Sequence, residues 1–115
     1  MAFNEIQNKK IELVVEGYLE RKRPPVEIRK DLDISYRIEN QSVYIYEIRP
    51  QWDDKSKIMN IDVAKTTYVA KKNIWKIFWM RSDLKWHGYE PDPIVENIEE
   101  FIDIVETDEY CCFWG

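Results

Sequence analysis

The sequence predicts an α+β protein, with an antiparallel sheet of four to five strands flanked by an N-terminal and a C-terminal helix. Two observations lead to this fold class: apolar residues recur at helical spacing near both ends of the chain, and they alternate with polar residues over most of its middle. With 115 residues, 44% of them hydrophobic, the chain is long enough to bury one core without disulfides or a structural metal. We therefore expect a single domain over residues 1–115.

The first element is expected to be a helix over about residues 4–22. Ile11, Val15 and Leu19 recur every four residues and so share one helical face. Asn4 is a favourable N-cap, and Pro24-Pro25 removes backbone N–H groups that a longer helix would need.

The sheet is expected to span about residues 26–89. From Val26 to Ile38 apolar residues alternate with charged ones, which is typical of a strand with one face in water. The polar residues 40–42 then form a short turn, so this strand and the next should make a hairpin. The remaining expected segments are a second strand at 43–49, a loop at 51–60, a strand pair at 63–71 and 74–81, and a short strand at 86–89.

The chain is expected to close with a helix and a docked tail. Asp92 is a favourable N-cap and Pro93 a favourable first helical residue, which predicts a helix over about residues 93–106 with an acidic outer face. The tail 108–115 ends in Tyr-Cys-Cys-Phe-Trp-Gly, and a segment this apolar should pack against the rest of the protein.

The strand expected at 74–81 is apolar on both faces. Trp75, Ile77 and Trp79 share one face, and Phe78 and Met80 lie on the other. Both faces of the sheet therefore need cover. Either the two helices lie on opposite faces, or one face meets a second copy of the chain in a homodimer.

Charge is distributed unevenly along the chain. The net charge is −5, but residues 61–89 carry six basic side chains against two acidic ones, and residues 90–115 carry nine acidic side chains and no basic one. Two interpretations follow: neighbouring elements match electrostatically, or two surfaces have different partners. In the first case the acidic closing helix would cover the basic segment when no ligand is bound.

Composition also bears on the compartment in which the protein works. No run of apolar residues reaches the length of a membrane-spanning helix, and the first residues lack the basic start and apolar stretch of a signal peptide. Cys111 and Cys112 are neighbours in the chain, which is unfavourable for an unstrained disulfide. We therefore expect a cytoplasmic protein with reduced thiols and no membrane partner.

Spaced tryptophans and a few charged residues form a recognisable pattern. It reads Glu47-x-Arg49-Pro50-x-Trp52, then Ala64-Lys65, then Trp75-x3-Trp79-x-Arg81-x-Asp83-x2-Trp86, with Phe113-Trp114-Gly115 at the end. Over nearly the whole chain this pattern resembles a family of small bacterial proteins that is catalogued as a domain of unknown function. The resemblance implies a stand-alone bacterial cytoplasmic protein and brings no activity, substrate or cofactor with it.

Six residues are the candidates for a binding site: Glu47, Arg49, Trp52, Lys65, Arg81 and Trp86. The face of the second strand that carries Glu47 and Arg49 begins apolar and ends charged, and the proline at 50 holds Arg49 extended. A guanidinium with rings nearby would suit an anion joined to a flat apolar group. The alternative is a structural Glu47–Arg49 ion pair beside tryptophans that serve only as packing.

No catalytic or metal-binding constellation is expected. His87 is the only histidine, the two cysteines have no second pair at zinc spacing, and no glycine-rich phosphate loop is present. Asp33 followed by Glu47-x-Arg49 is faintly similar to the carboxylate order of metal-dependent nucleases, which leaves such an enzyme as a minor alternative.

The interpretation we favour from sequence is a non-enzymatic binding or protein-interaction domain without a cofactor. Its main alternative is a nucleic-acid-binding module that uses the basic aromatic segment 61–89, where bases would stack on rings while cations follow phosphates. The net charge of −5 argues against nucleic acid, because such domains are usually basic.

Overall fold

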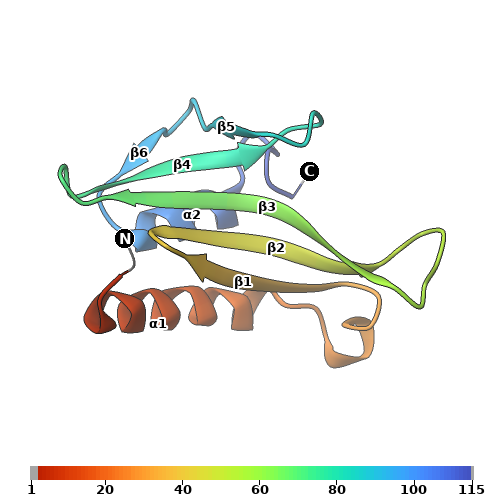
Figure 1. The fold of residues 1–115 in the computed structure, drawn as a ribbon. Helices are drawn as coiled ribbons and strands as arrows, with labels where there is room; N and C mark the ends of the chain where they lie inside the picture. The colour runs from red at the N-terminus through yellow and green to blue at the C-terminus, as the bar shows by residue number, and fades with distance from the viewer. Residues whose placement is uncertain (1–2, 115) are drawn as a thin grey trace.

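A computed structural model describes residues 3–114 as an antiparallel sheet with two helices (Figure 1). This α+β architecture confirms the expected fold class, with six strands in place of four or five. The elements in chain order are α1 (Glu5–Lys22), a 3₁₀ turn η1 (Val26–Ile28), β1 (Asp33–Glu39), β2 (Ser42–Pro50), β3 (Ile58–Val69), β4 (Ile74–Met80), β5 (Trp86–Gly88), β6 (Ile94–Val95) and α2 (Ile98–Thr107).

The strands lie side by side in the order in which the chain forms them, from β1 to β5. β1 and β2 make the expected hairpin through a two-residue turn, where Asn40 adopts a φ of 53° that asparagine tolerates well. β3 pairs with β2 on one side and with β4 on the other. The free side of β4 is shared by β5 at one end and the short β6 at the other.

Both helices pack on the same face of the sheet. Val15 and Tyr18 of α1, Ile45 of β2, and Phe101 and Val105 of α2 are all buried in one core. Ion pairs join the two helices directly, with Lys10 Nζ 3.3 Å from Glu99 Oε2 and Arg21 Nε 3.4 Å from Glu106 Oε2. The alternative with helices on opposite faces is therefore wrong, and no helix of the described chain covers the second face of the sheet (Figure 1).

The start of α1 is fixed by a reciprocal cap. The Asn4 side chain accepts a hydrogen bond from the Gln7 N–H at 2.8 Å, and the Gln7 side chain accepts one from the Asn4 N–H at 3.1 Å. These two bonds satisfy N–H groups that the first helical turn leaves open. No helix among the described residues has the length and apolar character needed to cross a bilayer.

The first strand begins at Asp33 and not at Val26. Residues 26–32 instead form two tight turns, in which the Ile28 N–H bonds to the Pro25 carbonyl and the Asp31 N–H to the Ile28 carbonyl. Val26 remains largely exposed, so its place in the alternating pattern does not reflect burial. The sequence shows the same interruption, because Lys30 occupies a position that the alternation assigns to an apolar residue.

The third strand begins at Ile58, five residues before the expected start at Val63. Residues 58–61 are exposed on both faces of the hairpin. Their sequence therefore lacks the alternation of apolar and polar residues that marks a strand with one buried face. They are nonetheless held in a ladder, since β2 pairs with β3 as far as Pro50 opposite Ile58.

The closing helix begins after Asn97 and not after Asp92. The Asn97 side chain accepts a hydrogen bond from the Glu100 N–H at 2.9 Å. Pro93 instead precedes β6, and its carbonyl accepts a bond from the Ile77 N–H at 3.0 Å. Tertiary pairing with β4 thus outweighs the local Asp-Pro signal for a helix start.

The tail is held by one carboxylate. Asp108 ends α2 in a left-handed conformation, and its two oxygens accept hydrogen bonds from the Phe113 and Trp114 N–H groups at 3.1 and 2.8 Å. Phe113 is buried against the ring of Tyr89, with centroids 5.0 Å apart. Gly115, the last residue of the expected docked tail, lies outside the described residues.

Candidate functional site

The six residues expected to form a site lie in four separate places. Arg49 Nη2 lies 2.9 Å from Glu47 Oε2, so these two form a local ion pair. Trp52 is 90% exposed in the loop between β2 and β3. Arg81 lies over the ring of Trp79, 5.4 Å from its centroid. Lys65 and Trp86 lie together on the uncovered face of the sheet.

That uncovered face carries a row of alternating cations and rings. Arg37, Tyr44, Lys65 and Phe78 are consecutive cross-strand partners on β1, β2, β3 and β4. Their side chains point away from the helices, because the residues on either side of each contribute to the opposite face. We call this surface the open face and define it as Arg37, Tyr44, Tyr46, Lys65, Phe78 and Trp86.

Lys65 lies at the centre of the open face. Its ammonium nitrogen is 5.2 Å from the ring centroid of Phe78, 5.4 Å from that of Tyr44 and 5.8 Å from that of Trp86. The Tyr44 and Trp86 rings are themselves 5.9 Å apart. Each ring attracts the cation through its electron-rich face. Lys65 forms no salt bridge with any residue of the described chain.

Arg37 is held rigidly at one end of the row. Its guanidinium donates to both oxygens of Asp62, at 2.8 and 3.4 Å, and lies 4.2 Å from the centroid of Tyr44 and 5.4 Å from that of Tyr46. The Asp62 hydrogen bonds raise the pKa of Arg37, which therefore stays charged at any physiological pH. The two tyrosine rings are thus oriented by a fixed cation.

The unpaired cations of the described chain and the acidic residues of α2 differ in their partners. None of the six basic residues in 61–89 forms a salt bridge within the described chain, whereas acidic residues of α2 pair with α1. α2 packs on the other face of the sheet, against Trp75 and Ile77, and so leaves the cations and rings of the open face uncovered, contrary to one expectation from the sequence. The net charge of −5 therefore does not describe the open face.

The nuclease-like carboxylates do not meet. Asp33 pairs opposite Ile48 and Glu47 opposite Ile34, so the two acidic side chains leave opposite faces of neighbouring strands. Each already has an arginine partner, Arg23 and Arg49 respectively. Among the residues described, no three His, Cys, Asp or Glu side chains gather as a metal site.

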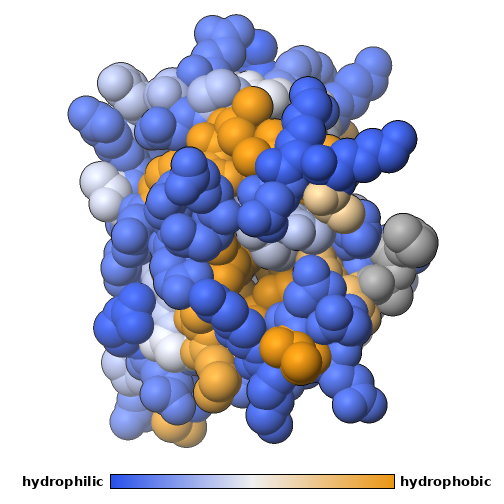
Figure 2. Space-filling model, turned by 90° about the vertical axis from the view of Figure 1, so that its left-hand side faces the viewer, coloured by the Kyte–Doolittle hydropathy of each residue, from blue (hydrophilic) through white to orange (hydrophobic). Residues whose placement is uncertain are grey.

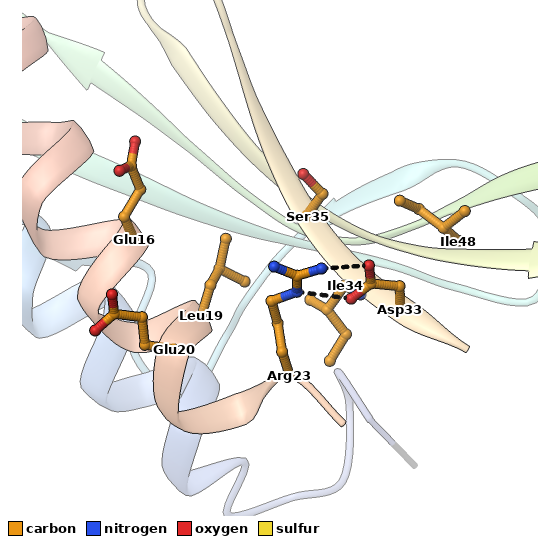
Figure 3. A pocket seen from close by; sticks show the side chains of 8 residues that line it. All are labelled: Glu16, Leu19, Glu20, Arg23, Asp33, Ile34, Ser35 and Ile48. Carbon is orange, nitrogen blue, oxygen red and sulfur yellow. Dashed lines mark hydrogen bonds and ion pairs between the residues drawn. The ribbon is translucent and has the colours of Figure 1, made fainter. Parts of the chain in front are cut away.

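A cavity of about 380 Å³ lies between the end of α1 and β1 (Figure 3). Arg23 donates to both oxygens of Asp33 there, at 2.8 and 2.7 Å, and these bonds hold the pKa of Asp33 below its usual range. Glu16 accepts a bond of 2.6 Å from the Tyr36 hydroxyl. The charged groups of this cavity thus bind one another and tie α1 to the sheet.

Two other hollows lie on the described chain, and the second contains a cation without a salt bridge, Arg81. An apolar furrow with hydrophilic rims, about 180 Å³ in volume, lies where α1 and α2 approach the β3–β4 turn (Figure 2), and the Tyr68 hydroxyl on its wall donates to Asn73. The cavity of about 300 Å³ beside Arg81 is lined by Cys112, and burial raises the pKa of that thiol. A protonated thiol is a poor nucleophile.

Sequence reasoning missed four residues of the open face: Arg37, Tyr44, Tyr46 and Phe78. Val43 and Ile45 predict which face of β2 lies in the core, and this prediction assigns no role to Tyr44 and Tyr46, which alternate with them. The available signal was that the other face of β2 also follows the alternation, with a ring at 44 and again at 46 and a cation on the strand before it.

Residues 3–115 match the model of a protein family described as a domain of unknown function (DUF3024). No curated protein and no solved structure matches the chain. The match confirms the kind of family that the tryptophan pattern resembled.

Proposed function

The chain belongs to the DUF3024 family, whose description states no function, and from that premise we propose that it binds single-stranded nucleic acid on its open face. The observation that carries the proposal is the cross-strand row of Arg37, Tyr44, Lys65 and Phe78 on a sheet face that no described helix covers.

The rings of the open face suit unpaired bases. Tyr44, Phe78 and Trp86 lie on β2, β4 and β5, surround one cation and are each partly exposed, so bases of an extended strand that crosses the sheet can reach more than one ring. Antiparallel sheets with helices on one face bind single strands in this manner in other proteins, by stacking bases on exposed aromatic side chains. Stacking requires bases that are not paired in a duplex, which favours a single strand over a double helix.

The charges around the rings suit phosphate. Lys65 has no carboxylate partner in the described chain, and Lys76, on the same face of β4, has none either. A phosphate backbone can therefore approach these two ammonium groups without first breaking an ion pair. The acidic side chains of α2 lie on the far side of the sheet and repel the ligand little at physiological salt.

A protein partner is the second candidate for the same surface, since aromatic residues and arginine are also enriched at protein interfaces. A protein surface would be expected to bring a carboxylate to Lys65, and its binding would compete with that of an oligonucleotide. The titration described next separates the two candidates. A surface that binds nucleic acid should bind a defined oligonucleotide with an affinity that falls as the salt concentration rises, and a surface that binds only protein should not.

The test is a fluorescence-anisotropy titration of labelled single-stranded and double-stranded oligonucleotides at low and moderate salt. We expect the single strand to bind more tightly than the duplex, and affinity to fall as salt rises. Absence of binding to every single-stranded probe at low salt would refute the proposal.

A matched pair of tryptophan variants identifies the surface. Trp86→Leu removes a ring from the open face and keeps an apolar side chain, so the binding free energy should weaken by about 1–3 kcal/mol, which is a fall in affinity of about 5- to 150-fold. Trp52→Leu removes the same kind of ring from the loop between β2 and β3, where Trp52 is 90% exposed, and should leave the affinity unchanged. Equal effects of the two variants would show that the ligand does not bind on the open face.

A further inference from the structure

β3 has a free edge where it runs beyond the rest of the sheet. β4 pairs with β3 only from Ala64 to Val69, whereas β2 pairs with it as far as Ile58. Residues 58–62 are therefore bonded to β2 on one side and to no described strand on the other. Figure 1 shows this part of the β2–β3 hairpin reaching past the ends of β4 and β5. We call residues 58–62 the free edge segment.

The free edge segment exposes three apolar side chains beside its unpaired backbone edge. Ile58 is 69% exposed, Met59 39% and Ile61 36%. Strand edges that stay monomeric are commonly protected by charged side chains, especially lysine, by proline or by covering structure, and the sequence Ile-Met-Asn-Ile-Asp has no lysine or proline and one charged residue, Asp62, which is paired with Arg37. The edge at β1 differs, because its strand carries Asp33, Arg37 and Glu39.

We propose that the free edge segment pairs antiparallel with the same segment of a second copy of the chain, on a two-fold axis through Asn60. The segment is five residues long and Asn60 is its middle, so the whole free length pairs in this register. A contact between identical surfaces closes into a dimer and does not propagate.

The side chains are self-complementary in this register. Met59 of one chain lies opposite Ile61 of the other, and both point to the same face, so the two copies bring four apolar side chains together. Asp62 comes opposite Ile58, and its carboxylate is already neutralised by Arg37 at 2.8 Å. No like charges therefore meet across the axis.

The dimer would join two six-stranded sheets into one, with both open faces on the same side. A two-fold axis within a sheet is perpendicular to it, which keeps equivalent faces together. A contact of five residues a side is small, so the dimer should be weak and its population should depend on concentration. The proposed pairing does not involve the residues of the open face, so its test is independent of the test for nucleic-acid binding.

Cysteine cross-linking tests the register. On a two-fold axis the Cα atoms of residue 60 would lie about 4.5–5.5 Å apart, which is within the range for a disulfide. In a Cys111→Ser, Cys112→Ser background, Asn60→Cys should form a covalent dimer under mild oxidation. Lys72→Cys, in the exposed β3–β4 turn, is the matched control and should stay monomeric. Equal cross-linking of the two variants would overturn the proposal.

Sedimentation tests the association itself. The wild-type chain should shift from 14.0 kDa towards twice that mass as concentration rises. Met59→Glu combined with Ile61→Glu places charges at the paired edge and should hold the protein at the lower mass; since both side chains are exposed, the variant should keep the wild-type circular dichroism spectrum. A wild type that stays at 14.0 kDa throughout, or a double variant that associates equally well, would overturn the proposal.

Discussion

At the scale of single residues, Lys65 distinguishes the open face from an ordinary polar sheet surface. Three rings surround its ammonium group at 5.2 to 5.8 Å, and no carboxylate of the described chain binds it. The charge and aromatic content of segment 61–89 were readable from sequence, and Lys65 and Trp86 were named there. The partners Arg37 and Tyr44 were not, because cross-strand register decides which side chains meet and one sequence does not contain it.

The prediction at this scale concerns salt. For single strands, the slope of log affinity against log salt is about −0.7 for each phosphate neutralised. Lys65→Gln should therefore weaken binding and make that slope shallower by about 0.7. Lys10→Gln removes a lysine that pairs with Glu99 on the helical side and should change neither quantity. An unchanged slope for Lys65→Gln in anisotropy titrations would show that this lysine does not contact phosphate.

At the scale of elements, the spacing of apolar residues located the two helices. The errors of the sequence prediction lie in where the helices and strands begin and end. The Asp92-Pro93 signal is a good local helix start, yet those residues precede β6 and α2 is capped by Asn97. Residues 26–32 look alternating but turn back on themselves after two prolines. At Asp92-Pro93 a contact distant in sequence decides the boundary, and hydrophobic spacing does not show it. At residues 26–32 a backbone turn decides it, and the one trace in the spacing is Lys30 at a position that the alternation assigns to an apolar residue.

A pair of cap variants tests this boundary. Asn97→Ala removes the acceptor for the Glu100 N–H and should lower the free energy of unfolding by about 1 kcal/mol. Asp92→Ala changes the residue that local sequence favours as the cap, and it should lower the free energy of unfolding by less than about 0.5 kcal/mol. Urea denaturation measures both. The reverse order of effects would place the start of α2 at Pro93.

At the scale of the whole molecule, one face of the sheet is covered and the other carries Lys65 and Lys76, which have no salt bridge in the described chain. This arrangement explains how a chain of net charge −5 can present a basic aromatic surface. The sequence indicated that both faces of β4 are apolar and that both need cover, from helices on opposite faces or from a second copy of the chain on one face. The sequence did not show that both helices pack on the same face. Helices on one face and helices on opposite faces give the same helical and alternating patterns of apolar residues.

The buried tyrosines make stability depend on alkaline pH. Burial raises the pKa of Tyr18 and of Tyr89 to about 12 in each case, from a usual value of 10.0. The folded state therefore keeps protons that the unfolded state releases above pH 10, so stability is full below that pH and falls as pH rises towards 12. Each of the two residues should lower the free energy of unfolding by about 1.4 kcal/mol per pH unit in this window.

Tyr18→Phe separates this effect from general alkaline damage. The Tyr18 hydroxyl has no hydrogen-bond partner among the described residues, and the neighbouring Trp114 indole offsets only part of the rise in pKa. The variant should therefore fold as stably as the wild type at neutral pH and lose stability less steeply above pH 10. Denaturant unfolding across this pH range is the measurement, and parallel curves for both proteins would contradict the assignment.

The most direct test of the open face is an NMR titration of isotope-labelled protein with a short single-stranded oligonucleotide. Binding there should shift the backbone amides of Tyr44, Lys65 and Phe78 and the indole N–H of Trp86, while the amides of α2 remain in place. Largest shifts on α2, or no shift at all at high oligonucleotide concentration, would contradict the assignment of the open face as the binding surface.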